Sequence, residues 1–411
     1  MRINFAAARG SARAWRACAA AVCAALLTAC STGAGPTDVP TAAIVPPLNA
    51  AGSQNRPPVK IALLLPMGGM GETAVVAKSM KRAAELALFE RNDPSVQLVT
   101  KDDGGTAAGA RAAADAAVRD GAEIILGPLF AKSVNGVAPV TRQARVPVLA
   151  FSNDTQVAGN GVYLMSALPE QEVDRIVAYA ASRGKRHFAA LIPDTAYGRV
   201  VEPAFRRAVE RAGGSVAIVE KYPPGANGML RPAKRVVEAI RNNAVAGAPV
   251  DALFLPGGQD ALPQIGPVIA YSGLDTSRVK LLGTGAWDFP SIGRDSAFVG
   301  GWYPSPDPVA WRAFAERYAK TFGSTPPRIA SVAFDAMGIA ISLSTNPPGT
   351  RFTPGNLTRK NGFAGVDGIV RLEPSGLSQR GLAVLKVQTF GATVIDPAPR
   401  SFNGTQLSSA E

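Results

Sequence analysis

Short apolar runs alternate with longer amphipathic stretches along most of this chain, and this alternation constrains its fold more than any other feature. The first run, VKIALLLP at residues 59–66, is almost wholly apolar and predicts a strand buried on both faces. Residues 74–92 carry apolar side chains at helical spacing and predict an amphipathic helix. Further strands are expected at 96–100, 124–126 and 146–150, and further helices at 107–119 and 132–144. Strands joined by helices of this length predict a parallel sheet with right-handed crossovers.

A second series of the same kind begins after residue 165. Helices are expected at 170–182, 203–212, 231–243 and 263–272, and strands at 188–192, 216–219, 252–255 and 280–282. Because a single hydrophobic core rarely grows beyond about 250–300 residues, we expect two α/β lobes. Towards the end of the chain, strands at 369–372 and 383–388 predict an antiparallel addition to a parallel sheet.

The first thirty residues have the layout of an export signal. Residues 1–29 contain four arginines and no acidic residue, and an alanine-rich apolar run at 17–27 follows the arginines. Leu27-Thr28-Ala29-Cys30 resembles the bacterial lipobox, so we predict a lipoprotein signal peptide over 1–29 and lipidation of Cys30. The alternative is an ordinary signal peptide cut at an A-x-A site. Residues 30–58, rich in Pro, Gly, Ala and Ser, predict a flexible linker.

Composition argues against several classes of function. The cysteines are Cys18, Cys23 and Cys30, so the chain after the predicted cleavage site has no disulfide, no cysteine-based metal site and no second thiol. His187 is the single histidine, which argues against a multi-histidine metal site and against most hydrolases. We therefore expect no enzymatic activity, no metal and no cofactor.

Charge gives little support for binding to nucleic acid. The formal charge is +12, of which the four arginines of the leader supply +4, which leaves +8. A moderate positive charge can favour anionic lipid or an acidic partner surface. The chain has no dense run of Lys and Arg and no alternation of aromatic and basic residues. We therefore expect that it does not bind nucleic acid.

Four blocks of sequence carry a family resemblance. VKIALLLPMGGMGE, EIILGPLFAKSVNGVAPVTRQARVPVLAFSND, PDTAYGRVVEPAFRRAVERAGGSV and LLGTGAWD resemble the type I periplasmic binding proteins of the leucine-binding class, from residue 59 to about 395. The resemblance implies an α/β fold of two doubly wound, Rossmann-like lobes that are joined by three crossover segments and close on a small ligand by hinge motion. We expect lobe 1 at 59–165 plus 287–345, lobe 2 at 166–286 plus 346–400, and a tail at 401–411.

Within that family, one stretch favours a particular branch. PVLAFSNDTQVAGNGVYLMSALPEQEVDRIVAYAASRG resembles lipoproteins that activate penicillin-binding proteins. The resemblance implies a non-catalytic activator of peptidoglycan synthases, with a bifunctional penicillin-binding protein as partner and an N-terminal lipid anchor on the periplasmic side of the envelope. Ser31 after the cysteine implies the outer membrane. The alternative is a solute-binding protein that delivers an amino acid or similar solute to an ABC permease.

The candidate ligand cleft is formed by loops that follow the predicted strands. In open α/β sheets, ligands bind beyond the carboxyl ends of the strands. The candidate residues in these loops are Met67, Gly69, Gly71, Phe130, Ala131, Ser133, Ser152, Asn153, Asp154, Tyr197, Gly258, Gln259, Trp287 and Asp288. Tyr197 and Trp287 could stack on a ligand or serve as plain packing residues, and the sequence does not decide between these roles.

Two of these positions depart from the amino-acid-binding pattern. Relatives hold the ligand carboxylate with a serine after the Gly-Pro turn, where this chain has Ala131, with Ser133 two residues further on. The threonine position of the relatives is Asp154 here, and its carboxylate would repel another carboxylate. These departures favour the activator over a free-amino-acid receptor. Residues 152–154 could instead be a helix N-cap segment.

Two further motifs have weaker support. The glycine pattern at 69–74 fits the dinucleotide fingerprint G-x-G-x-x-A, but the acidic pair Asp102-Asp103 lies about 30 residues further on instead of about 20. We interpret these glycines as allowing the loop to approach the cleft closely. Asp102-Asp103 and Glu170/Glu172 could be a glycosidase couple, but acids in loops and in first helical turns usually serve solvation or the helix dipole.

Overall fold

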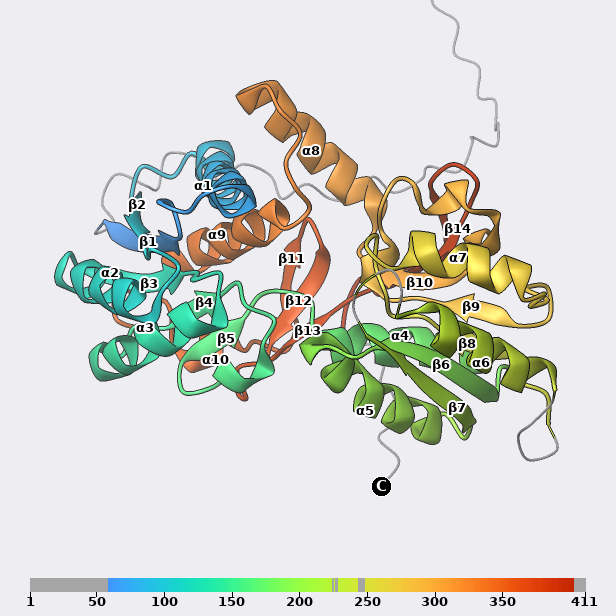
Figure 1. The fold of residues 1–411 in the computed structure, drawn as a ribbon. Coiled ribbons are helices and arrows are strands. Elements are labelled where there is room, and N and C mark those ends of the chain that lie inside the picture. Colours follow the sequence, from blue (N-terminus) through green and yellow to red (C-terminus); the bar gives the residue numbers. More distant parts are fainter. Residues whose placement is uncertain (1–57, 224, 226–227, 243–247, 403–411) are drawn as a thin grey trace, which may run out of the picture. The chain divides into compact units, whose positions relative to one another are not determined.

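The computed structural model describes residues 58–223, 225, 228–242 and 248–402 (Figure 1). The predicted signal peptide, Cys30, the linker up to residue 57 and residues 403–411 of the predicted tail lie outside the described residues. Among the helices of the described part, none combines the length and the apolar character needed to cross a bilayer.

The first sheet is parallel throughout and has the strand order β2-β1-β3-β4-β5. Its strands are β1 (Val59–Leu65), β2 (Val96–Asp102), β3 (Ala122–Leu126), β4 (Val148–Ala150) and β5 (Val162–Leu164), and its helices are α1 (Glu72–Arg91), α2 (Ala107–Arg119) and α3 (Ala131–Ala144). The continuous apolar run in β1 has a direct cause. Ile61 and Leu63 belong to one hydrophobic cluster, whereas Ala62 and Leu64 belong to another, so both faces of the strand are covered.

The second sheet repeats this plan and extends it. Its order is β15-β14-β10-β9-β8-β6-β7, and its first five strands along the chain are parallel in the same relative order as the first sheet. Its strands are β6 (His187–Pro193), β7 (Ser215–Tyr222), β8 (Ala252–Phe254), β9 (Lys280–Leu282), β10 (Trp302–Ser305), β14 (Ala383–Val387) and β15 (Ala392–Asp396). Its helices are α4 (Pro169–Ser182), α5 (Ala196–Arg211), α6 (Leu230–Arg241) and α7 (Leu262–Tyr271). The predicted α/β fold with two lobes is confirmed.

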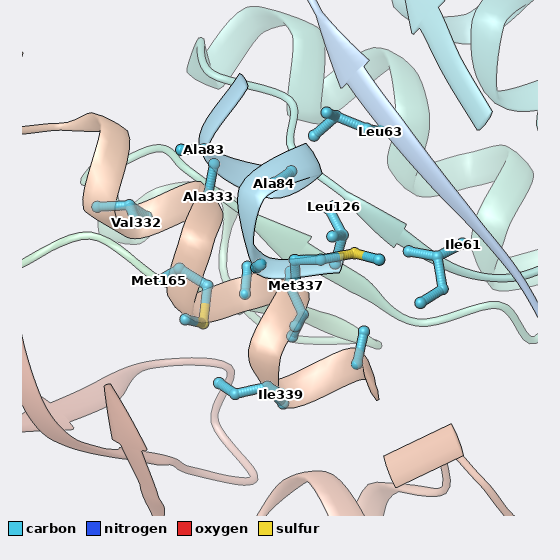
Figure 2. Packing of buried hydrophobic residues seen from close by; sticks show 14 of the residues in the cluster. Ile61, Leu63, Ala83, Ala84, Leu126, Met165, Val332, Ala333, Met337 and Ile339 are labelled. Carbon is cyan, nitrogen blue, oxygen red and sulfur yellow. The ribbon is translucent and has the colours of Figure 1, made fainter. Parts of the chain in front are cut away.

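The core of the first lobe includes a helix from late in the chain. The helix α9 (Ala330–Ser344) packs against α1, and alanines such as Ala84 and Ala333 let the two backbones approach closely (Figure 2). Met337 and Leu126 lie in the same buried cluster, so α9 also covers the sheet. The core of the first lobe is therefore formed by two segments that lie far apart in the sequence.

The later crossovers fall at other residues than expected. The strand β10 lies in the second sheet between β9 and β14, although the sequence analysis assigned residues 287–345 to the first lobe. The helix α8 (Pro308–Phe322) follows β10. Phe352 and Leu357, expected in the second lobe, pack in the same cluster as α1 and α9. The short, proline-containing strand WYPS carries too weak a sequence signal to show that the chain stays in the second sheet until Ser305.

A third, small sheet precedes the return to the second lobe. It contains β11 (Phe363–Gly365), β12 (Gly368–Leu372) and β13 (Ser378–Arg380), all antiparallel, after the short helix α10 (Pro354–Leu357). The two strands expected at 369–372 and 383–388 exist as β12 and β14 but belong to different sheets. The predicted antiparallel addition is provided by β14, which pairs with β10.

Candidate functional site

The loop after β1 is held by an acid from the end of the neighbouring strand. The carboxylate of Asp102 accepts hydrogen bonds from the backbone N–H groups of Met67, Gly68 and Gly104, each at 2.9 Å. Gly71, just before α1, has φ +60°, a conformation that favours glycine. The glycines of this loop, Gly69 included, thus fit its backbone path, and Asp102 braces the loop.

The loop after β3 turns its polar groups inwards. Phe130 precedes α3, Ala131 is its first residue, and Ser133 is completely buried in the first turn. Asp103 is also buried, and burial raises the pKa of this carboxyl, while Ser133 and the N–H of Gly105 lower it. Ser133 therefore lies beneath the loop beside Asp103. Since Asp103 is buried and Asp102 braces the β1 loop, this acid pair does not have the arrangement of a glycosidase couple.

The loop after β4 forms a local cap. Ser152 Oγ accepts a hydrogen bond from the backbone N–H of Asp154 at 3.1 Å, and Asp154 Oδ1 accepts one from Gln156 at 3.0 Å. This arrangement begins a short 3₁₀ helix at Thr155–Val157, and Asn153 is exposed beside it. The N-cap interpretation of residues 152–154 is confirmed.

In the second lobe, three loops bring a polar cluster together. We call the residues Glu172, Tyr197, Thr284 and Gly285 the second-lobe cluster. The hydroxyls of Tyr197 and Thr284 lie 2.9 Å apart, and the backbone N–H of Gly285 donates to Glu172 Oε2 at 3.0 Å. Tyr197 is in the first turn of α5 after β6, Glu172 in the first turn of α4, and the other two residues follow β9. All four thus lie at loop or helix starts beside the carboxyl ends of β6 and β9.

The glycine at position 285 leaves room for the carboxyl group of Glu172. A Cβ atom on Gly285 would lie 2.6 Å from Glu172 Oε1, well inside van der Waals contact. The missing side chain lets the carboxyl group of Glu172 reach the peptide nitrogen. The backbone of this loop therefore binds the carboxyl group of Glu172 directly.

Burial changes the protonation of the cluster. Burial raises the pKa of Glu172 to about 7, and the hydrogen bond from Gly285 only partly offsets that effect. Burial also raises the pKa of Tyr197, to which the nearby charge of Glu172 adds. Glu172 is thus divided between its neutral and ionised forms near pH 7, so it can donate or accept a hydrogen bond to a bound solute.

Other residues of the same lobe surround the cluster. The hydroxyl of Tyr222 at the end of β7 is buried, and the part of the chain that the structure describes supplies no hydrogen-bond partner for it. A Cβ atom on Gly257 would lie 2.8 Å from this hydroxyl, and one on Gly258 would lie 3.5 Å from Ala286. Gln259 is exposed beyond them. These glycines leave space next to the polar groups.

Two of the predicted cleft residues have structural roles. Trp287 is fully buried, donates through Nε1 to the carbonyl of Leu255 at 2.8 Å and packs edge-on against Phe298. The packing interpretation therefore holds for Trp287. Asp288 accepts hydrogen bonds from Ser305 at 3.0 Å and from Tyr303 at 3.4 Å. Both residues support the loop that carries Thr284 and Gly285.

Sequence reasoning found only part of this site. It singled out Tyr197 and Gly258, but it treated Glu172 as an acid of a first helical turn and did not consider Thr284. Glu172 and Gly285 are 113 positions apart, so only the tertiary fold shows their contact. The motif Gly283-Thr284-Gly285 directly after a predicted strand was the signal that could have indicated the loop.

Two surface hollows lie away from this cluster, in the first lobe. Two hollows of about 450 and 540 Å³ border α1, and Glu85 lines both of them. Met67 is the one predicted cleft residue among their linings. Within the described residues, no cluster of three or more His, Cys, Asp or Glu side chains is placed to hold a metal ion.

Two α/β lobes with a polar cluster at strand ends define a bilobal binding protein, and comparison with known proteins identifies the family. The family model described as "Periplasmic binding protein" matches residues 58–343. The chain belongs to this family, in its type I, Leu/Ile/Val-binding-like form. Family members and structural neighbours are solute-binding proteins, which are non-catalytic, in agreement with the expected lack of enzymatic activity.

The curated relatives are distant. An uncharacterized protein of Rickettsia prowazekii (strain Madrid E) is 25% identical over 186 residues, which are 45% of this chain and 48% of that protein. A Leu/Ile/Val-binding protein homolog 6 of Brucella melitensis biotype 1 is 24% identical over 256 residues, which are 59% of this chain and 63% of the relative. The chain thus spans about half to under two thirds of these relatives.

Solved structures show the same fold. A Rhodospirillum rubrum protein assigned to branched-chain amino acid ABC transport has a TM-score of 0.71 and 23% identity, covering 82% of this chain and 100% of its own. An ABC transporter substrate-binding protein from Sphaerobacter thermophilus has a TM-score of 0.67 and 20% identity, covering 84% and 98%.

Proposed function

We propose that this chain is the solute-binding protein of an ABC importer and that its second-lobe cluster holds the polar end of a small solute. The observation that carries this proposal is the contact of Glu172 with Gly285 beside the hydroxyl pair of Tyr197 and Thr284. Hydroxyls and a carboxyl that converge at the ends of parallel strands are the arrangement expected of a ligand site. The solute-binding proteins among the structural neighbours support the same function.

The chemistry of the cluster selects for hydrogen-bond donors. Its side chains are a carboxyl and two hydroxyls, and none of the four residues carries a positive charge. Such a cluster favours an amine or a hydroxyl over a carboxylate. In the first lobe, Ala131 cannot supply the serine hydroxyl that relatives use for a carboxylate. We therefore expect hydroxylated solutes and amines without a carboxylate to bind better than the standard amino acids.

The fold alone leaves the solute class open. A Desulfitobacterium hafniense protein of 17% identity forms a complex with Leu, and a Rhodopseudomonas palustris protein of 20% identity forms one with 3,4-dihydroxy benzoic acid. Proteins of one fold thus bind chemically different solutes, and the side chains of each site decide between them.

A thermal-shift panel tests the proposal. Amino acids, polyols, sugars and small amines are added to the purified protein, since a solute at 100 times its Kd stabilises the folded state by about 2.7 kcal/mol. We expect a shift with an amine or hydroxyl compound, reduced at least about tenfold in affinity by Glu172→Gln or Tyr197→Phe. Arg235→Gln, which removes a surface ion pair with Glu220, is the matched control and should leave the affinity unchanged. Shifts that persist in both cluster variants would contradict the assignment.

A second candidate function is activation of a peptidoglycan synthase. It is favoured by Ala131 at the serine position and by Asp154, whose carboxylate is engaged in a local cap. In this case the purified protein should change the rate of glycan polymerisation or crosslinking by a bifunctional penicillin-binding protein, with no solute shift in the panel. A solute shift together with an unchanged synthase rate would exclude this second candidate.

Membrane attachment is a separate proposal. Export and lipidation at Cys30 would place the protein on the periplasmic side of the envelope, and Ser31 favours the outer membrane. The support is the sequence LTAC after a basic and then apolar leader. Globomycin should cause a diacylated precursor to accumulate, and Cys30→Ser should abolish membrane fractionation. A Cys30→Ser protein that still fractionates with membranes would refute lipidation.

A further inference from the structure

The hydroxyl of Tyr222 is buried at the edge of the second sheet. β7 is the edge strand beside β6, and its last residue, Tyr222, lies opposite Pro193. The side chain is 2% exposed and packs in the same hydrophobic cluster as Leu253 and Leu255. Within the described residues, its Oη has no hydrogen-bond partner. A buried hydroxyl without a partner lowers stability, so its presence calls for a role outside the fold.

Glycine at position 257 lets the loop after β8 pass close to this hydroxyl. A Cβ atom on Gly257 would lie 2.8 Å from Tyr222 Oη and 3.2 Å from the Cβ atom of Ala261. Gly257 is not among the glycines with positive φ, so this close approach, and not the backbone conformation, accounts for the glycine. The hydroxyl therefore lies against the backbone that follows the carboxyl end of β8, which is where ligands bind in open α/β sheets.

Tyr222 is also a neighbour of the second-lobe cluster. Along β6, Leu191 belongs to the hydrophobic cluster that contains Tyr222, whereas Ile192 belongs to the one against which Tyr197 packs, so the two tyrosines come from opposite faces of the sheet. Burial and then the charge of Glu172 raise the pKa of Tyr197, and Tyr222 adds a smaller effect of the same sign. The two tyrosines thus lie near each other at the carboxyl ends of the strands.

The charges around Tyr222 determine which solute group it can bind. Burial raises the pKa of Tyr222, and the charge of the exposed Asp260 adds to this effect, so the hydroxyl keeps its proton at neutral pH and can donate it. A protonated amine has no lone pair to accept this proton, and Asp260 and ionised Glu172 would repel a carboxylate. A solute hydroxyl is neutral and can accept from Tyr222 while it donates to a carboxylate.

We propose that Tyr222 binds a second hydroxyl of the solute and that the solute is therefore a polyhydroxylated compound, a polyol or a sugar, rather than an amine. The second-lobe cluster holds one hydroxyl of this compound, and Tyr222 with the carboxylate of Asp260 holds another. An analogue that lacks the second hydroxyl leaves Tyr222 without a partner and binds more weakly. The inference rests on the proposed function, because it narrows the specificity of the same site.

The first measurement is isothermal titration calorimetry of the purified full chain with glycerol, xylitol, myo-inositol, glucose and butan-1-amine. We expect at least one of the four polyhydroxylated probes to bind more than about tenfold more tightly than the amine. Tyr222→Phe, which removes only the hydroxyl, should weaken that binding about tenfold. The matched control is Tyr318→Phe in the first lobe, where an equally buried hydroxyl donates to the carbonyl of Ser79 at 3.4 Å. This control should leave the affinity unchanged.

The second measurement is the urea midpoint of the protein without solute. Tyr222→Phe should keep the midpoint of the wild type or raise it, because the hydroxyl contributes no hydrogen bond to the fold. Tyr318→Phe should lower the midpoint, because it removes a hydrogen bond that the fold uses. If the midpoint of Tyr222→Phe falls as far as that of Tyr318→Phe, the hydroxyl serves the fold and the inference is overturned.

A third variant approaches the same hydroxyl from the other side. Gly257→Ala places a methyl group beside Tyr222 Oη and should also abolish binding of the polyhydroxylated probe, with circular dichroism to verify folding. If this variant unfolds, Tyr222→Phe decides the question. Unchanged affinity in Tyr222→Phe, or no binding by any of the four polyhydroxylated probes, would overturn the inference.

The same titrations separate this inference from the proposed function. If butan-1-amine binds and Glu172→Gln weakens its binding, while the polyhydroxylated probes do not bind, the role of Tyr222 is wrong and the solute site of the second-lobe cluster stands. If a polyhydroxylated probe binds equally well to wild type, Glu172→Gln and Tyr222→Phe, both proposals are wrong.

Discussion

The two parallel sheets have the same strand order, yet the loops at their carboxyl ends use polar side chains in different ways. In the first sheet, the carboxylates of Asp102 and Asp154 accept hydrogen bonds from backbone N–H groups, Asp102 from the neighbouring loop after β1 and Asp154 from its own loop. In the second sheet, Glu172 and Tyr197 reach across to a third loop and form a cluster. The comparison teaches that topology determines where a site can lie, whereas the partners chosen by a few side chains determine which lobe supplies the chemistry.

The largest effect on the free energy of unfolding is expected at Trp287, which is buried beneath the loop of the second-lobe cluster. Trp287→Ala removes a fully buried indole and its hydrogen bond to Leu255, so we expect the free energy of unfolding to fall by about 3–5 kcal/mol. Urea denaturation measures this loss. Phe390→Ala, at a side chain that is 92% exposed, is the control and should change the free energy by less than about 0.5 kcal/mol. A loss for Trp287→Ala as small as that of the control would mean that this residue does not support the loop.

The second largest loss of stability is expected at Asp102, whose carboxylate holds the loop after β1. Asp102→Ala leaves three backbone N–H groups without their acceptor, and we expect a loss of about 1–3 kcal/mol in the free energy of unfolding. Asp102→Asn keeps one acceptor oxygen and should recover part of that loss. If both variants match the wild type, water replaces the carboxylate without cost, and the first-lobe loop is not braced by a side chain.

The sequence predicted the fold better than the site. The run at residues 59–66 is apolar because β1 is covered on both faces, and such a local pattern can be read without tertiary information. β10 was missed because its four residues, WYPS, include a proline and show no clear periodicity. Tyr197 was found because it follows a predicted strand. The role of Glu172 depends on a contact with Gly285 that no local pattern records, and the burial of Trp287 depends on packing between distant segments.

The raised pKa of Glu172 in the second-lobe cluster predicts a pH dependence of stability. The pKa of Glu172 is raised to about 7 in the folded protein, above its usual value of 4.5, so the native state holds a proton that the unfolded state has lost between these pH values. The free energy of unfolding should therefore fall as the pH rises from about 4.5 to about 7. Glu172→Gln should flatten this slope in urea midpoints measured at pH 5, 6 and 7. Asp335, whose pKa burial also raises to about 7, should leave a residual slope of the same sign. If Glu172→Gln leaves the slope unchanged, the carboxyl of Glu172 is exposed to water and its pKa is not raised in the folded protein.

The smallest expected effect tests the comparison most directly. Asp154→Ala removes one cap bond to Gln156 at an exposed position, so we expect a loss of only about 0.5–1 kcal/mol in the free energy of unfolding. Because this carboxylate serves its own loop, the affinity for any solute found in the thermal-shift panel should not change. Asp154→Asn, which keeps an acceptor for the cap, separates capping from charge. If Asp154→Ala reduced the solute affinity as Tyr197→Phe is expected to do, both lobes would supply selective side chains, and the assignment of the chemistry to the second lobe would be wrong.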